Sequence, residues 1–238
     1  MTAKKKSTNF KAGILVFTTV IFVVFSFYAY QVLFTANFQI KKNDKEVVFY
    51  INKQMDYKAV IDSMKKNQIL HDELSFRFLS KLLGYPDKII PGAYLISKDD
   101  NNFNVLKRLI KGRQTPAKLV FNNVRLKEDL AVKISNKLSI EKDSLIWALN
   151  NQEVCKRYGF DTSTIMCMFI PNTYEMYWNL TTDRFLDKMF KEYDKFWTVA
   201  RQEKAKKVGL TQNQVQILAS IVEAETQQNA EKARIAGV

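Results

Sequence analysis

The chain contains 238 residues and carries a formal net charge of +13, with 37 Lys and Arg against 24 Asp and Glu. Its 47% hydrophobic content, which includes 17 Phe and 10 Tyr, is enough to bury a core and excludes an intrinsically disordered protein. The positive charge suits an anionic partner such as lipid headgroups, nucleic acid or an acidic polymer. Because the lysines are scattered and no RNA-binding or zinc-finger pattern occurs, we expect no nucleic acid partner.

Residues 12–30 carry no charge and are long enough for a membrane-spanning helix. Four lysines precede them, so the positive-inside rule places the N-terminus in the cytoplasm and the rest outside. A cleaved signal peptide is the alternative, but the apolar run is long for one and no A-x-A cleavage site comes after it. We predict a cytoplasmic tail at 1–11, a single transmembrane helix in the lipid bilayer at 12–30, and a stalk at 31–45.

The chain offers few ligands for a metal. Cys155 and Cys167 fit no metal motif, and His71 is the single histidine. We therefore predict no metal and no cofactor. A disulfide between the two cysteines is one possibility, and two small buried apolar residues are the favoured one.

The first group of predicted elements alternates strand and helix. By residue content and spacing we predict a strand at 47–51, helices at 57–66 and 73–83, and a turn and strand at 89–96. Gly84 ends the second helix. This order, strand–helix–helix–strand, spans about fifty residues and buries little alone, so we expect it to pack against the next part of the chain.

The second group is mostly helical. We predict a helix at 104–111, a strand at 117–121, helices at 127–138 and 143–149, irregular chain at 159–168, a loop at 169–174 and a long helix at 183–207. A break at Gly209 separates that helix from the next one. The fold class expected from both groups is α+β.

A helix from about Gln212 is predicted by Thr211 and Gln214, which have the spacing of a capping box. At about 100° per residue, Glu225 shares a face with Leu218, Ile221 and Val222, and Glu223 points to the other side.

The position of Glu225 suggests acid chemistry. A carboxyl group among apolar side chains loses solvation, which favours its protonated form, as a general acid requires. The alternative is an ordinary surface carboxylate at the end of an amphipathic helix, and the pattern alone favours that alternative.

Several segments resemble the MltG/YceG-like endolytic peptidoglycan transglycosylases. Residues 219–226, ASIVEAET, match the segment A-S-I-[VI]-E-x-E-T around the family's catalytic glutamate, which corresponds to Glu225. Residues 169–174 resemble the family loop F-x-P-[DE]-T-Y, with Asn172 at the acidic position. Residues 91–94, PGAY, resemble the A-G-x-Y segment that closes a LysM-like subdomain. The resemblance covers about residues 12–238.

The resemblance implies a lytic transglycosylase. Such an enzyme cleaves the bond between N-acetylmuramic acid and N-acetylglucosamine without water and leaves a 1,6-anhydro end, with Glu225 as both acid and base. Residues 46–112 would form the LysM-like βααβ subdomain and 113–238 the catalytic domain, outside the cytoplasmic (inner) membrane of a bacterium. Glycan strands of peptidoglycan are the implied substrate and cell-wall synthesis proteins the candidate partners. Candidate substrate-binding residues are Asn172, Thr173, Tyr174, Glu223 and Thr226.

The sequence departs from the family pattern at three places. Met166 and Cys167 replace a glycine-containing pair before the loop, and Asn172 cannot act as an acid or base. The chain stops at residues 235–238, which is mid-domain in the family, so we expect an incomplete catalytic domain, either a fragment or a naturally short protein. Rival interpretations are a membrane-anchored peptidoglycan-binding protein without activity and a hydrolase with two carboxylates.

Overall fold

The computed structural model describes residues 3–40, 44–122, 124–226 and 228–237, and the chain divides into two compact units, Met1–Thr115 and Pro116–Val238. Both units mix helices with a two-stranded sheet, so the predicted α+β class is confirmed. Residues 1–2 of the predicted tail and 41–43 of the predicted stalk lie outside the described residues.

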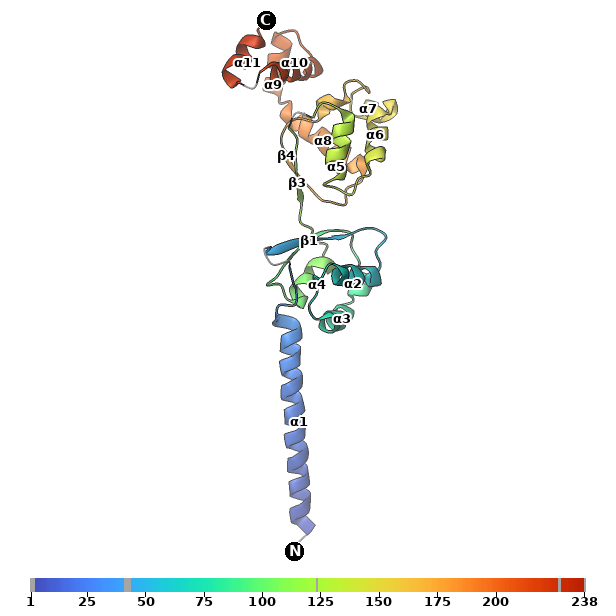
Figure 1. The fold of residues 1–238 in the computed structure, drawn as a ribbon, viewed down its shortest axis with the longest axis vertical. Helices are drawn as coiled ribbons and strands as arrows, with labels where there is room; N and C mark the ends of the chain where they lie inside the picture. Colours follow the sequence, from blue (N-terminus) through green and yellow to red (C-terminus); the bar gives the residue numbers. More distant parts are fainter. Residues whose placement is uncertain (1–2, 41–43, 123, 227, 238) are drawn as a thin grey trace. The chain divides into compact units, whose positions relative to one another are not determined.

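Unit 1 begins with α1, Ala3–Phe34, which is longer than the predicted span (Figure 1). Within it, Phe10–Phe34 is long and apolar enough to cross a membrane, and its central side chains are exposed within the chain. At 1.5 Å per residue these 25 residues extend about 37 Å, more than the roughly 30 Å of a hydrocarbon core. The ends of this helix would therefore extend beyond the hydrocarbon core.

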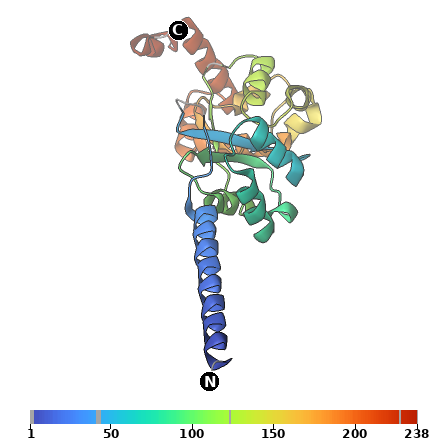
Figure 2. The same cartoon turned by 60° about the horizontal axis from the view of Figure 1, so that its bottom comes forward.

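The sheet of unit 1 pairs β1, Glu46–Ile51, with β2, Gly92–Ser97, in antiparallel register (Figure 2). Phe49 faces Tyr94 across the ladder, and both are buried. Tyr50, between Phe49 and Ile51, is exposed, which is the two-residue alternation of a strand with one buried face.

Three helices and a short 3-10 turn cover the buried side of this sheet: α2 at Tyr57–Lys66, α3 at Glu73–Leu82, η1 at Tyr85–Asp87 and α4 at Asn102–Ile110. The order β1, α2, α3, β2 is the predicted one. Side chains of Asp56, Asp72 and Asn101 accept hydrogen bonds from the first-turn amides and so cap the three helices. Gly84, at φ 67°, makes the left-handed turn after α3.

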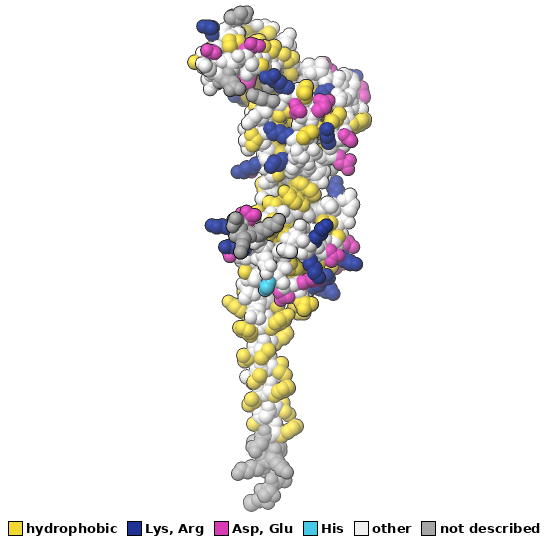
Figure 3. All heavy atoms as spheres, viewed as in Figure 1, with side chains coloured by type: hydrophobic (Ala, Val, Ile, Leu, Met, Phe, Trp, Pro, Cys, Tyr) yellow, Lys and Arg dark blue, Asp and Glu magenta, His cyan; other side chains and the backbone are white. Residues whose placement is uncertain are grey.

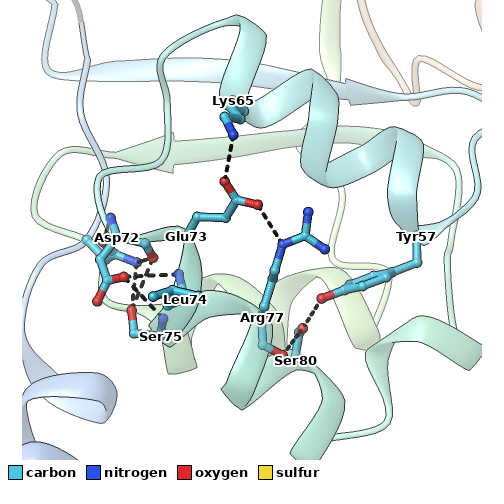
Figure 4. Close-up of polar contacts among 9 residues, drawn as sticks. Tyr57, Lys65, Asp72, Glu73, Leu74, Ser75, Arg77 and Ser80 are labelled. Atoms are coloured by element: carbon cyan, nitrogen blue, oxygen red, sulfur yellow. Dashed lines mark hydrogen bonds and ion pairs between the residues drawn. The ribbon is translucent and has the colours of Figure 1, made fainter.

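The start of α3 is fixed by side-chain contacts as well as by its cap (Figure 4). The Glu73 carboxylate lies 2.6 Å from Arg77 Nε and 3.2 Å from Lys65 Nζ on α2. These two cations lower the pKa of Glu73, with the hydrogen bond from Arg77 as the largest cause. Both ion pairs are partly exposed and contribute little stability. The Lys65–Glu73 pair joins α2 to α3, and the Arg77–Glu73 pair lies within α3.

The end of α1 and the residues after it pack into the core of unit 1, where the sequence predicts a stalk. Val32, Asn37 and Phe38 are all buried, and isolated bridges join Ala36 to Asn101 and Phe38 to Leu70. Apolar Val32 and Phe38 belong to the core of the unit, and this burial is what a polarity-based stalk prediction overlooks.

Unit 2 pairs β3, Ala117–Val120, with β4, Thr173–Met176, in a second antiparallel ladder. Its helices are α5 Lys127–Ser135, α6 Lys142–Asn150, α7 Gln152–Arg157, η2 Ile165–Met168, α8 Thr182–Phe196, α9 Val199–Lys207, α10 Gln212–Glu225 and α11 Asn229–Ile235. One hydrophobic core holds the sheet and α5 to α8 together, with Leu119, Leu130 and Phe185 among its buried members.

Two predictions for unit 2 are wrong. The long helix at 183–207 is two helices, because Trp197 leaves helical geometry and turns its ring into the core, where it is 4% exposed. Residues 173–174, predicted as the end of a loop, instead begin β4, because Val120 and Thr173 are strand partners. Both outcomes depend on contacts between distant parts of the chain.

Candidate catalytic site at the end of helix α10

Helix α10 begins as the sequence predicts. Gln214 N donates to Thr211 Oγ1 at 3.3 Å, and Thr211 N donates to Gln214 Oε1 at 2.8 Å, so both halves of the capping box are formed. The box fixes the first turn and thereby the direction in which each later residue of α10 points.

The face of α10 that carries Glu225 is open to solvent. Leu218 is 40% exposed and Ile221 is 51% exposed, whereas Val222 is 8% exposed. Glu225 itself is exposed. The structure therefore shows the surface carboxylate that the pattern alone favours, and not a carboxyl group buried among apolar neighbours. The helix packs through Val215 and Val222 instead, and periodicity alone cannot tell which apolar side chains find a partner.

The two other candidate residues of the segment, Glu223 and Thr226, bind α11. Glu223 Oε2 lies 2.5 Å from Lys232 Nζ in an ion pair whose side chains are 42% and 27% exposed. Thr226 Oγ1 donates to Glu231 Oε2 at 2.9 Å and accepts from Gln228 N at 3.0 Å. Glu223 and Thr226 thus hold the turn between the two helices.

Glu225 differs from Glu223 and Thr226 in its contacts. Within the part of the chain that the structure describes, its carboxylate has no hydrogen-bond or ion-pair partner. It stands at the last residue of α10, beside the exposed apolar face and between two residues engaged with α11. Of the two carboxylates in the segment, Glu225 is the one available to another molecule.

The second predicted group lies around the start of β4. Asn172 and Thr173 are exposed, and Asn172 Oδ1 accepts from Thr173 N at 2.7 Å. Tyr174 is 5% exposed, donates its hydroxyl to Ile170 O at 2.6 Å and packs against Phe121. Burial raises the pKa of Tyr174 to about 12, so it remains a neutral donor. The described residues show no hydrogen bond between this group and Glu225.

A surface hollow of about 450 Å³ lies at the opposite end of α10, lined by Tyr158, Phe190, Tyr193, Thr211 and Asn213 among others. Tyr193 donates its hydroxyl to Gln212 Oε1 at 3.1 Å, and burial raises its pKa to about 12. Because the 14 residues of α10 span about 20 Å, the hollow does not reach Glu225.

Cys155 and Cys167 are both buried as free thiols, and burial raises the pKa of each. Among the residues described, no group of three or more His, Cys, Asp or Glu side chains lies together as a metal site would require.

Sequence reasoning missed the contributions of Glu231 and Lys232. Their contacts with Thr226 and Glu223 depend on the turn between α10 and α11, and a nine-residue spacing from Glu223 to Lys232 is no helical signal. Sequence reasoning also missed helix α11, Asn229–Ile235, because none of its residues is buried.

Comparison with known proteins places these observations in a family context. The model of the YceG-like family matches residues 49–238. A crystal structure at 2.6 Å of a YceG-like protein from Listeria monocytogenes is similar over 79% of this chain and 67% of that chain, with 16% sequence identity and a TM-score of 0.46. No curated protein matches the sequence significantly.

Proposed function

Since this chain belongs to the YceG-like family, we propose that it is a membrane-anchored endolytic transglycosylase of peptidoglycan. It cleaves the bond between N-acetylmuramic acid and N-acetylglucosamine in nascent glycan strands and so limits their length. Helix α1 anchors it in the cytoplasmic membrane of a bacterium, and the residues after α1 lie outside the cytoplasm. Residues 46–112 act as a LysM-like subdomain and residues from 113 onward belong to the catalytic domain.

One carboxyl group suffices for this reaction. Glu225 donates its proton to the glycosidic oxygen while the bond from that oxygen to C1 of the muramic sugar breaks. The resulting Glu225 carboxylate accepts the proton of the C6 hydroxyl group while the C6 oxygen forms a bond to C1 of the same muramic sugar. The products are a 1,6-anhydro end and a free hydroxyl on the leaving sugar, and Glu225 regains its proton without consuming water.

The observation that carries the assignment is the difference between two neighbouring carboxylates. Glu223 is paired with Lys232, and this ion pair occupies its carboxylate. Glu225 has no such partner among the described residues and lies at the surface. A substrate can therefore reach Glu225, whereas Glu223 has a structural role in holding α11.

The exposed apolar face of α10 suggests that the bound substrate itself excludes water from the Glu225 carboxyl group. Ile217, Leu218 and Ile221 are each at least 40% exposed beside Glu225. A glycan lying over this face removes water from the carboxyl group and favours its protonated form. Substrate binding then creates the environment that the free protein lacks.

The remaining candidate residues divide by exposure. Asn172 and Thr173 are exposed and are proposed to contact sugar hydroxyls. Tyr174 is buried beneath them and positions the start of β4, and Thr226 positions the end of α10.

The test compares Glu225→Gln with the matched variant Glu223→Gln. We expect Glu225→Gln to lower the formation of anhydro-ended products by about 10²- to 10⁴-fold, the usual contribution of acid–base catalysis. Glu223→Gln should keep activity, and circular dichroism should show both variants folded. Activity retained in Glu225→Gln, or lost only in Glu223→Gln, rejects the assignment.

The exposure of Glu225 also favours a second candidate, a membrane-anchored peptidoglycan-binding protein without activity. In that case the unsubstituted protein binds purified glycan strands in a sedimentation assay and releases no fragments. Release of fragments that disappears in Glu225→Gln excludes this candidate.

A further inference from the structure

Helix α3 is apolar on two opposite faces, and one of them has no partner among the described residues. Phe76 and Leu79 are buried in the core of unit 1. Leu74, Phe78 and Leu82, spaced by four residues, are 78%, 56% and 70% exposed. Residues at this spacing form a continuous strip along a helix. We call these three side chains the α3 strip.

The end of α1 is fixed beside α3 by a buried polar network. Asn102 Nδ2 donates to Val32 O of α1 at 3.1 Å and to Ser75 Oγ of α3 at 3.0 Å. Asn37 Nδ2 donates to Asn102 Oδ1 at 2.7 Å and to Asp72 O at 2.8 Å. Both asparagines are almost fully buried, so α3 cannot move far from the last turn of α1.

The views agree with this arrangement. Figure 1 and Figure 2 both show α3 beside the end at which α1 enters unit 1, while β1 lies farther along the direction in which α1 points. Figure 3 shows hydrophobic side chains along α1 and again where it meets unit 1, next to Lys and Arg side chains.

The length of α1 sets the level of its end relative to a bilayer. Phe10–Phe34 exceeds the hydrocarbon core by about 7 Å, so its last turns reach the headgroup region. Tyr30 and Phe34, whose ring centroids are 5.4 Å apart, are exposed there and suit the aromatic belt of a membrane interface. The first turn of α3 is joined to that end through Asn102.

The charges around the α3 strip also suit the headgroup region of the bilayer. Glu73 is neutralised by Arg77 and Lys65, and Lys81 is exposed beside Leu82. An amphipathic helix with apolar side chains on one side and basic residues at its margin binds in the plane of a lipid interface.

We propose that the α3 strip docks on the outer leaflet of the bilayer that α1 spans, so that the part of unit 1 after α1 rests on the lipid surface. The proposal rests on the membrane anchoring in the proposed function. The occupant is lipid, because α3 lies beside the end of α1 at the level where α1 leaves the membrane. Docking removes from water three side chains that are otherwise left exposed.

The test uses the full chain in nanodiscs of phosphatidylethanolamine and phosphatidylglycerol. Leu74→Cys, Phe78→Cys and Leu82→Cys are each labelled with a nitrobenzoxadiazole probe. Lys53→Cys, in the turn after β1, is the matched exposed control, and Val20→Cys in α1 reports the anchor. The unsubstituted chain is the labelling blank, because Cys155 and Cys167 are buried.

We expect the three probes on the α3 strip to lose most iodide quenching and to be quenched by spin-labelled lipid. The Lys53→Cys probe should show the reverse. Quenching of the α3 probes by iodide to the same extent as the control overturns the proposal, and so does shielding from iodide without quenching by lipid, which indicates a protein occupant. If the Val20→Cys probe is not quenched by lipid, the anchoring fails as well; if only the α3 probes fail, the anchoring stands.

Discussion

At the scale of single residues, Thr226 links the proposed acid to the last helix of the chain. It is 8% exposed, and its hydroxyl both donates to Glu231 and accepts from Gln228 N. Since α11 has no buried residue, these bonds and the ion pair from Glu223 to Lys232 are its main attachment among the described residues.

We predict that Thr226→Val loosens α11. The substitution keeps the side-chain shape but removes both hydrogen bonds, at a cost of about 1 kcal/mol. Hydrogen-exchange mass spectrometry should show faster exchange across residues 229–235 and little change in α8. Thr211→Val is the control at the other end of α10, and it should leave exchange in α11 unchanged. Equal exchange in Thr226→Val and the unsubstituted chain contradicts this prediction.

A second residue-scale prediction concerns acid. Hydrogen bonds from the Ser163 and Thr164 side chains, together with backbone amides, lower the pKa of Asp161 from 3.8 to about 2. A carboxyl group with a lowered pKa stabilises the fold above its unfolded pKa, and this contribution is lost as the pH falls toward its folded pKa. The loss therefore falls between pH 3.8 and about pH 2.

For the unsubstituted chain, the denaturant concentration at the midpoint of unfolding should be lower at about pH 2 than at about pH 5. The decrease should be smaller for Asp161→Asn. Asp143→Asn, an exposed carboxylate in the first turn of α6, is the control and should behave like the unsubstituted chain. An identical pH dependence in all three proteins rules out this role for Asp161.

At the scale of elements, the buried network of Asn37, Ser75 and Asn102 joins four segments of unit 1. Asn37 also accepts from Asp72 N at 2.6 Å, so its amide is bonded on both sides. Removing one partner leaves buried polar groups unsatisfied, at about 1–3 kcal/mol each.

We therefore predict that Asn37→Ala destabilises unit 1 by about 2 kcal/mol. Asn67→Ala is the matched control, since Asn67 is exposed and bonds locally to Ser63 O. Hydrogen exchange of α3 and α4, measured in detergent, should be faster in Asn37→Ala than in the unsubstituted chain. In Asn67→Ala, the free energy of opening derived from exchange should stay within about 0.5 kcal/mol of the unsubstituted value. Similar exchange in both variants means that the network is not a main support.

The sequence predicts local features of the elements well. Helices α2 and α3, the turn at Gly84 and the capping box of α10 all come from short-range spacing, and all are confirmed. The division of 183–207 at Trp197 and the pairing of β4 with β3 are set by distant contacts, which spacing does not encode.

The candidate site divides in the same way. Glu225 can be placed at the end of its helix from the sequence, but its exposure cannot, because that depends on which face of α10 meets the core. The roles of Lys232 and Glu231 need the α10–α11 turn to be known.

At the scale of the whole molecule, the proposed function requires the N-terminus on one side of a membrane and the rest of the chain on the other. We predict that, in intact cells, an impermeant maleimide labels Lys53→Cys and does not label Ser7→Cys until the membrane is opened. The four N-terminal lysines are the reason for this orientation. Labelling of Ser7→Cys in intact cells contradicts it.

The reaction itself provides the most direct test, because a lytic transglycosylase adds no water to its product. Purified glycan strands are digested by the protein in water labelled with a heavy oxygen isotope, and the released fragments are weighed by mass spectrometry. We predict fragments with 1,6-anhydro ends, one water lighter than hydrolysis products and free of the label. Fragments with labelled reducing ends would show hydrolysis and contradict the proposed reaction.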